Sequence, residues 1–241
     1  MLPAIRSLAT YVFIALYVLV LGPPCLLIAL LFRSPALLYR VGHFGVWTGL
    51  RLSGITMVVE GAEHIQLGRP AVYAANHTSQ VEPPVIFDTL SGLFPRLRIL
   101  YKAELRKLPI LVRAFDLAGF IPLERGNRDQ SLPAIDRAAE AIREGNSFLI
   151  FPEGTRSRTG ELLPFKKGGF ILAIKGQAPI VPIAISGARA AMRKGSVLIY
   201  PVTVHVRIAP PIETAGMTLD DRDLVVNAAR RQIEEMLNRS T

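Results

Sequence analysis

The sequence predicts an α/β fold in which a mostly parallel sheet is flanked by helices and preceded by an apolar motif of two helices. Strand-like and helix-like segments alternate over most of the chain. One strand-like segment, residues 147–151, is a continuous apolar run, which is typical of a strand buried on both faces. The chain also begins with a long apolar stretch. We therefore divide its 241 residues into a helical motif, residues 1–53, and a main domain, residues 54–241.

The first apolar stretch carries no charge from Ser7 to Phe32. It is long enough to cross a bilayer, which takes about 20 apolar residues. Gly22, Pro23 and Pro24 interrupt it, however, and this combination breaks or kinks a helix. Neither half reaches spanning length alone. Two helices joined at this break and dipping into one leaflet therefore compete with a single kinked span.

The next segment predicts an amphipathic helix at the membrane interface. Arg33, Arg40 and Arg51 alternate there with apolar residues, and Tyr39 and Trp47 are expected to anchor at headgroup level. If the chain spans, this basic bias places the main domain on the cytoplasmic side. An ordinary buried helical hairpin is the structural alternative.

The hydrophobic periodicity and the turn residues of the main domain predict its helices and strands. Pro83 and Pro84 fit the first turn of a helix that starts after His77. Apolar residues on one face predict further helices at 129–144, 166–176 and 220–237. Apolar and β-branched runs predict strands at 55–61, 71–76, 98–102, 147–151, 179–185 and 202–208.

Composition limits the classes of function. Half of the residues are hydrophobic, which excludes a disordered chain, and the net charge is +9. A basic chain binds nucleic acid, an anionic membrane or an anionic substrate. The sequence lacks a run of Lys and Arg and a nucleic-acid-binding motif. We therefore expect a membrane surface and a phosphate-bearing substrate, and no nucleic acid. The single cysteine, Cys25, excludes an internal disulfide and a cysteine-rich metal site.

Of the four histidines, His77 has the position of a functional residue. It follows a buried strand and precedes a helix, where α/β sheets present ligand-facing loops. A neutral imidazole accepts a proton near pH 7 when a carboxylate holds its ring, and Glu82 is a candidate partner. Five helical steps rotate by about 140°, so the pair must bridge a turn that leads into the helix. His43, His64 and His205 are expected to be structural.

Two further stretches carry candidate binding residues. In "FPEGTRS", residues 151–157, a buried strand ends, Gly154 permits a left-handed turn, and Arg156 offers a planar fork suited to phosphate. In "GFIPLER", residues 119–125, Arg125 ends a strand-like segment. Exposed charges at ordinary turns explain either stretch taken alone.

Four stretches taken together, in this order, resemble the motifs of the glycerolipid acyltransferases, and above all the 1-acyl-sn-glycerol-3-phosphate acyltransferases. They are "NHTSQVE", "GFIPLER", "FPEGTRS" and "VPIAI", which begin at Asn76, Gly119, Phe151 and Val181. The resemblance covers about residues 55–208. It implies transfer of an acyl group from acyl-CoA or acyl-ACP, as co-substrate, to the sn-2 hydroxyl of lysophosphatidic acid. This reaction forms phosphatidic acid in phospholipid biosynthesis.

The resemblance also assigns roles to residues. His77 would take the proton of the lipid hydroxyl, Glu82 would orient the ring, and Ser79 would not act as a nucleophile, because the hydroxyl attacks the thioester directly. No cofactor and no metal are expected. The implied substrate-binding residues are Lys102, Arg125, Glu153, Gly154, Thr155 and Arg156, with Lys102 the weaker candidate and Glu153 expected to be ionised.

One departure from the family pattern leaves alternatives open. The family acid is usually Asp, whereas this chain has Glu82, whose extra methylene must be accommodated for the carboxylate to reach His77. Asp88 is a poor substitute because its position does not fit the motif. Acylation of another lysolipid, such as a lyso-ornithine lipid or a lysophospholipid in remodelling, competes with the main hypothesis. So does an inactive membrane protein that only binds lipid.

Overall fold

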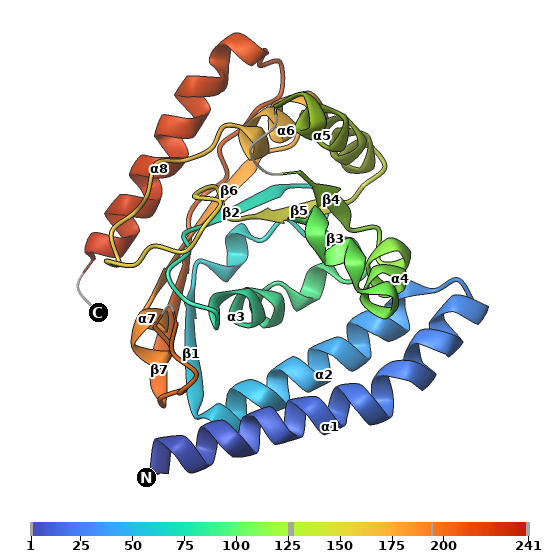
Figure 1. Ribbon diagram of the computed structural model, residues 1–241. Helices are drawn as coiled ribbons and strands as arrows, with labels where there is room; N and C mark the ends of the chain where they lie inside the picture. Colours follow the sequence, from blue (N-terminus) through green and yellow to red (C-terminus); the bar gives the residue numbers. More distant parts are fainter. Residues whose placement is uncertain (1, 125–127, 194, 240–241) are drawn as a thin grey trace.

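The fold was analysed in a computed structural model that describes residues 2–124, 128–193 and 195–239. The described residues form a seven-stranded sheet in the order β1-β7-β6-β2-β5-β3-β4 (Figure 1). Neighbouring strands are parallel except β6 and β7, which confirms the predicted mostly parallel sheet. The strands are β1 (Ile55–Glu60), β2 (Val72–Ala75), β3 (Leu97–Lys102), β4 (Ile121–Leu123), β5 (Ser147–Ile150), β6 (Ile180–Ser186) and β7 (Val202–Ile208).

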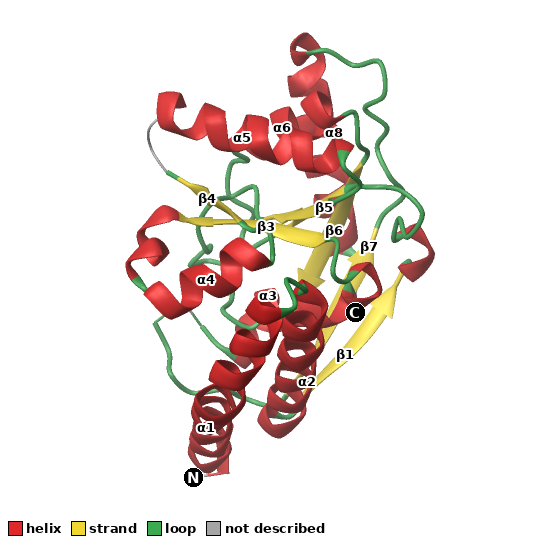
Figure 2. Cartoon of the chain, turned by 90° about the vertical axis from the view of Figure 1, so that its right-hand side faces the viewer, coloured by secondary structure: helices red, strands yellow, loops and turns green. Residues whose placement is uncertain are grey.

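Helices cover both faces of the sheet, as Figures 1 and 2 show from two sides. One face carries α1 (Leu2–Leu31), α2 (Pro35–Ser53), α3 (Glu82–Thr89) and α4 (Pro109–Leu117). The other carries α5 (Arg128–Arg143), α6 (Gly168–Gly176) and α8 (Arg222–Asn238), and α7 (Ala188–Ala191) is a short connection after β6. The predicted helices are present, whereas α4 was not anticipated because its apolar pattern is short.

Strand β2 separates two hydrophobic cores. Tyr73 and Ala75 face the core shared with α2 and α3, and Val72 and Ala74 face the core shared with α5 and α6. Side chains alternate between the two faces of a strand, so each residue after β2 also has a defined side. The sheet thus directs the loop that follows β2.

The predicted break in the apolar stretch is wrong. Helix α1 continues through Pro23 and Pro24, and the chain turns later, between α1 and α2. Each proline removes one backbone hydrogen bond, a loss that a helix of 30 residues survives. The turn itself has stronger stop signals: Arg33 adopts a positive φ of 48°, Ser34 is extended, and Pro35 opens α2. The two helices of the motif are therefore α1 and α2.

Tyr39 is not the interfacial anchor that the sequence predicted. Its side chain is buried, its hydroxyl donates a hydrogen bond to the backbone oxygen of Leu97, and its ring packs against Phe94. Helix α2 thus forms a layer between α1 and the core. Trp47 does remain partly exposed on α2, with the guanidinium of Arg51 4.2 Å from its ring.

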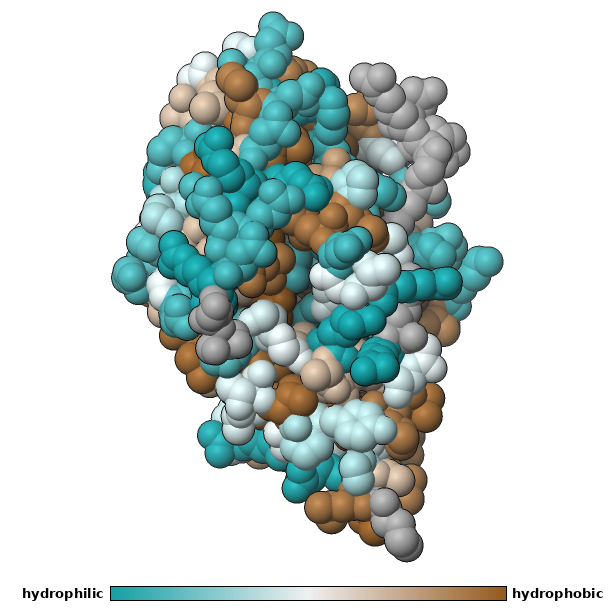
Figure 3. Space-filling view, turned by 90° about the vertical axis from the view of Figure 1, so that its left-hand side faces the viewer, coloured by the Kyte–Doolittle hydropathy of each residue, from teal (hydrophilic) through white to brown (hydrophobic). Residues whose placement is uncertain are grey.

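Most of the apolar surface of α1 is exposed. Among the described residues, α1 is the helix that is long and apolar enough to cross a membrane. Figure 3 shows hydrophobic residues at the lower tip of the molecule, where α1 begins, and a mainly hydrophilic upper part with some hydrophobic residues between. Exposed apolar patches of this size mark interaction surfaces, and together with the composition this one indicates association with a membrane.

Candidate active site

The candidate residues gather where the parallel strands end. Strands β2, β3, β4 and β5 are mutually parallel, so their carboxyl ends lie along one edge of the sheet. His77 follows β2, the stretch from Pro152 to Arg156 follows β5, and Lys102 ends β3. Arg125, predicted to end the strand-like segment that begins at Gly119, lies outside the described residues. Such edges are the usual ligand sites of open α/β sheets.

His77 and Glu82 form the contact that their spacing predicted. His77 Nδ1 lies 2.8 Å from Glu82 Oε2, across a turn that leads into α3. Glu82 is the first residue of α3 and is fully buried, and Pro83 and Pro84 follow in its first turn. The prolines suit this position because the first residues of a helix need no N–H donor.

Thr78 holds the carboxylate of Glu82 in place. The Thr78 backbone N–H lies 2.8 Å from Oε2 and 3.0 Å from Oε1, and its hydroxyl donates to Oε1 at 2.5 Å. The glutamate thus folds back over the turn, which accommodates its extra methylene. Thr78 was not predicted from the sequence, although its place between the histidine and the acid could have suggested a supporting donor.

The ring of His77 is fixed on its other side by Phe151, the last apolar residue before the "PEGTR" turn. The two rings stack with centroids 4.3 Å apart. Because Nδ1 faces Glu82, the remaining nitrogen, Nε2, is the one that can take a proton from a substrate. The carboxylate can stabilise the imidazolium that forms, which is the arrangement of a general base.

Glu153 lies beneath the site and joins two loops. Its Oε1 accepts the His77 backbone N–H at 2.6 Å, and its Oε2 accepts the Leu163 N–H at 3.0 Å. Burial raises the pKa of Glu153, against the opposing effect of these two N–H donors. The structure therefore gives Glu153 a supporting position under the loop that carries His77. Its predicted contact with substrate stays a prediction.

The other predicted binding residues differ in exposure. Gly154 adopts a φ of +67°, and an added Cβ would lie 2.8 Å from Lys166 Cε, so this turn requires glycine. Thr155 is exposed and Arg156 is half-buried at the same turn. Lys102 is exposed and pairs with Glu104 at 2.9 Å, a surface ion pair that a phosphate can displace at small cost.

Other residues of the first motif are structural. The Asn76 side chain donates to the backbone oxygen of Ile185 at 3.0 Å and accepts its N–H at 2.7 Å, which extends the pairing of β2 with β6. Ser79 is fully buried and donates to the Met192 backbone oxygen at 2.7 Å. Asp88 contacts His43 rather than His77, which agrees with its rejection as a substitute acid.

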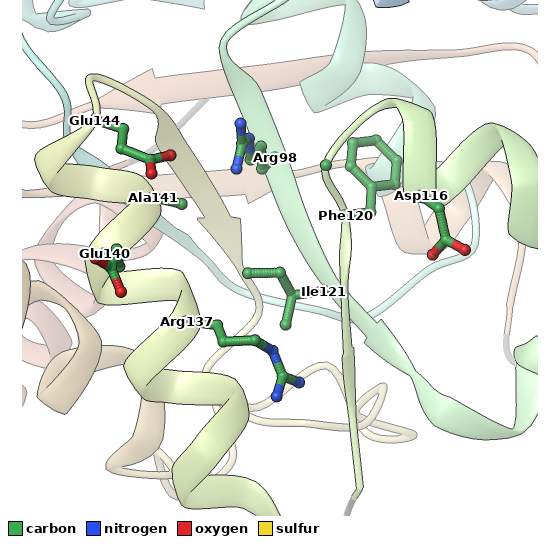
Figure 4. Close-up of a pocket in the computed structure, with 9 residues that line it drawn as sticks. Arg98, Asp116, Phe120, Ile121, Arg137, Glu140, Ala141 and Glu144 are labelled. Atoms are coloured by element: carbon green, nitrogen blue, oxygen red, sulfur yellow. The ribbon is translucent and has the colours of Figure 1, made fainter. Parts of the chain in front are cut away.

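Two cavities lie near the sheet, and His77 lines neither. One, of about 720 Å³, lies against α8 and includes Asn76 and Thr78 in its wall. The other, of about 380 Å³, lies at the amino end of β4 and is lined by Arg98, Arg137, Glu140 and Glu144, among others (Figure 4). Within the described part of the chain, no three His, Cys, Asp or Glu side chains are arranged to hold a metal ion.

Fold and site together define a membrane-associated α/β protein with a histidine–glutamate pair arranged for general-base chemistry. Residues 56–186 match the family model described as "Acyltransferase". The chain belongs to this family.

Relatives and a solved structure agree with this assignment. A 1-acyl-sn-glycerol-3-phosphate acyltransferase of Limnanthes douglasii is 35% identical over 185 residues, which span 76% of this chain and 62% of the relative. The human enzyme of that name, type alpha, is 32% identical over 76% of this chain and 64% of its own length. The match thus spans less than two thirds of each relative. The crystal structure of the 1-acyl-sn-glycerophosphate (LPA) acyltransferase PlsC from Thermotoga maritima shares 27% identity at a TM-score of 0.80, covering 99% of this chain and 97% of PlsC.

Proposed function

We propose that the protein transfers an acyl group from a thioester to the sn-2 hydroxyl of 1-acyl-sn-glycerol-3-phosphate and so forms phosphatidic acid. The observation that carries this proposal is the His77–Glu82 pair at the carboxyl edge of the sheet. The names of the relatives and of the structural neighbour support the acceptor.

The reaction needs one base and proceeds in two stages. His77 Nε2 takes the proton of the sn-2 hydroxyl while the oxygen attacks the thioester carbonyl carbon, which gives a tetrahedral intermediate. The C–S bond then breaks, and the thiolate leaves and takes the proton back from the imidazolium. Glu82, held by Thr78, fixes the ring and offsets its positive charge. No acyl-enzyme forms, in keeping with the buried Ser79.

The binding residues follow from the motifs that contain them and, for Arg156 and Lys102, from their place along the same edge. We assign the acceptor phosphate to Arg156 and Arg125, with Lys102 in a weaker role, because a guanidinium binds phosphate through two parallel hydrogen bonds. Gly154 and Thr155 shape the turn beside Arg156. The donor is acyl-CoA or acyl-ACP, both of which are acidic and suit a chain of net charge +9.

The same proposal assigns the N-terminal motif, residues 1–53, to one membrane leaflet, with the main domain on the cytoplasmic side. Helix α1 is tied to the main domain, because Tyr11 donates to the Val197 backbone oxygen at 2.8 Å and Ser7 accepts the Ile199 N–H at 2.8 Å. It also packs along α2, where Tyr17 donates to the Val41 oxygen at 2.7 Å. These bonds favour a hairpin lying against the domain over a helix that crosses the bilayer away from it.

An acyl-transfer assay with the purified full chain tests this proposal. Lysophosphatidic acid is supplied with acyl-CoA or acyl-ACP, and lyso-ornithine lipid and lysophosphatidylcholine are alternative acceptors. We expect phosphatidic acid from the wild type and a loss of roughly 1,000-fold in His77→Gln, the scale of general-base catalysis. Preference for another acceptor would redirect the assignment. Binding of lysophosphatidic acid without turnover, with both donors, would instead indicate a lipid-binding protein.

A further inference from the structure

The segment after β3 presents apolar side chains outside the core. It comprises residues 103–117, which include the 3-10 turn η3 (Ala103–Lys107) and α4. All of these residues are described, and none is buried. The exposed fractions of Leu105, Leu108 and Ile110 are 37%, 52% and 69%. Together with Lys107 and Arg113 these residues are called the α4 patch. Exposed aliphatic side chains grouped in this way are typical of an interaction surface.

Helix α4 is nevertheless firmly attached to the domain through its other side. Phe115 packs against Tyr101, with ring centroids 4.7 Å apart, and against Phe120 at 5.3 Å. Arg106 joins the turn to the helix, because it donates to Asp116 and to the Tyr101 hydroxyl, each at 3.0 Å. The α4 patch is therefore an outward face of a docked helix.

Charge identifies the kind of partner that fits this face. Residues 102–116 contain four basic and two acidic side chains, a net charge of +2. The two acidic residues are engaged, Glu104 with Lys102 at 2.9 Å and Asp116 with Arg106 at 3.0 Å. Lys107 and Arg113 thus add positive charge beside the exposed aliphatic residues. Aliphatic side chains ringed by basic ones match the headgroup layer of an anionic membrane.

The position of the α4 patch continues the surface already assigned to the membrane. In both Figure 1 and Figure 2, α4 lies beside the connection between α1 and α2, on the same side of the sheet. The segment also follows Lys102 directly, at the edge where His77 lies. His77 stacks on Phe151, which packs against the core on this same side.

We propose that the α4 patch is a second membrane contact, which inserts into the headgroup layer of an anionic bilayer beside the N-terminal hairpin. With contacts on two sides, the edge that carries His77 faces the membrane. A lysolipid acceptor then reaches the site from the bilayer without passing through water. This inference rests on the proposed function only for its role in catalysis, since membrane contact is measurable without turnover.

Site-specific fluorescence tests the contact. The single cysteine is removed as Cys25→Ala, and a new one is introduced as Ile110→Cys or, as the matched control, as Leu224→Cys on α8, where the leucine is 67% exposed. Each is labelled with an environment-sensitive dye, and the full chain is bound to vesicles of phosphatidylcholine with phosphatidylglycerol. We expect a blue shift, and quenching by lipid-borne quenchers, at position 110 only. Equal quenching at both positions overturns the proposal, as does a blue shift without vesicles, which identifies a second copy of the chain.

Activity tests the role of the contact. In Ile110→Glu, kcat/KM on acceptor embedded in vesicles is expected to fall about tenfold, and on acceptor dispersed in detergent it stays within twofold. Lys107→Gln with Arg113→Gln should weaken the dependence on phosphatidylglycerol in the same assay. Equal losses in vesicles and detergent overturn the role. An inactive wild type refutes the proposed function instead, and the fluorescence result still decides the membrane contact.

Discussion

Helix α3 carries a carboxylate near each end, and each contacts a histidine that lies outside the helix. The two histidine–carboxylate pairs differ in ways that separate chemistry from structure. At its start, Glu82 contacts Nδ1 of His77 at 2.8 Å, and the side chains are 0% and 17% exposed. Near its end, Asp88 contacts Nε2 of His43 at 2.6 Å, and the side chains are 14% and 34% exposed. A contact between histidine and an acid therefore does not define a site.

The surroundings distinguish the two pairs. The first lies at the carboxyl edge of the parallel strands, has its acid held by Thr78 and its ring held by Phe151, and leaves Nε2 as the nitrogen that does not face the acid. The second joins α2 to α3 and borders the ring of Phe94. We infer that the first pair is arranged for proton transfer and that the second fastens the N-terminal motif to the helix that carries Glu82.

The sharpest test of this comparison removes each acid in turn. In Glu82→Ala, kcat/KM for acyl transfer is expected to fall roughly 1,000-fold, because His77 loses the group that orients it and stabilises its charge. In Asp88→Ala it should stay within about threefold. Steady-state kinetics on both variants, with circular dichroism to confirm folding, checks the contrast. Similar losses in the two folded variants would show that the pairs are equivalent.

The His77–Glu82 pair could be predicted from the sequence because its two residues lie close together along the chain. The turn between His77 and Glu82 is encoded within a few residues by the strand, the two prolines and the helix start. The supporting contact of Glu153 is not local, because its partner N–H belongs to His77, 76 residues earlier. The pairing of His43 with Asp88 also joins residues that are far apart in the sequence, so it was not predicted.

The errors in the predicted fold have similar causes. Tyr39 was predicted at the membrane interface because its sequence neighbours do not reveal its hydrogen-bond acceptor. That acceptor, the backbone oxygen of Leu97, lies 58 residues further along the chain. Two prolines looked like a helix end because sequence alone does not weigh two lost hydrogen bonds against the packing of α1 on α2. Strands, in contrast, were predicted closely, since apolar runs such as 147–151 have few other stable placements.

A third carboxylate sharpens the comparison, because Glu153 contacts the backbone of His77 instead of its ring. In Glu153→Gln an amide NH₂ takes the place of one carboxylate oxygen, so one of the two backbone N–H groups loses its acceptor. The free energy of unfolding should therefore fall by about 2 kcal/mol. Activity should fall less than in Glu82→Ala, since the ring contact remains. Thermal unfolding in detergent measures the first effect, and kinetics the second.

The pH dependence of stability tests the same residue. The pKa of Glu153 is raised above its ordinary value of 4.5 by burial, so the folded state holds this proton where the unfolded state has lost it. The contribution of Glu153 to stability is therefore full below pH 4.5 and falls as pH rises toward the raised pKa. The stability difference between wild type and Glu153→Gln should narrow over that window. A difference that widens with rising pH would contradict the assigned direction.

The smallest expected effect concerns the fastening pair itself. In Asp88→Asn the side chain keeps its size and can still accept a hydrogen bond, but it loses its charge beside His43. Because this pair is partly exposed, we expect the free energy of unfolding to fall by only about 1 kcal/mol, with kcat/KM unchanged within twofold. His43→Gln is the matched variant, and additive losses in the double variant would show that the two side chains do not interact. A large loss of activity in Asp88→Asn, without loss of stability, would mean that the position of α3, and through it the His77–Glu82 contact, depends on the N-terminal motif more than its fold suggests.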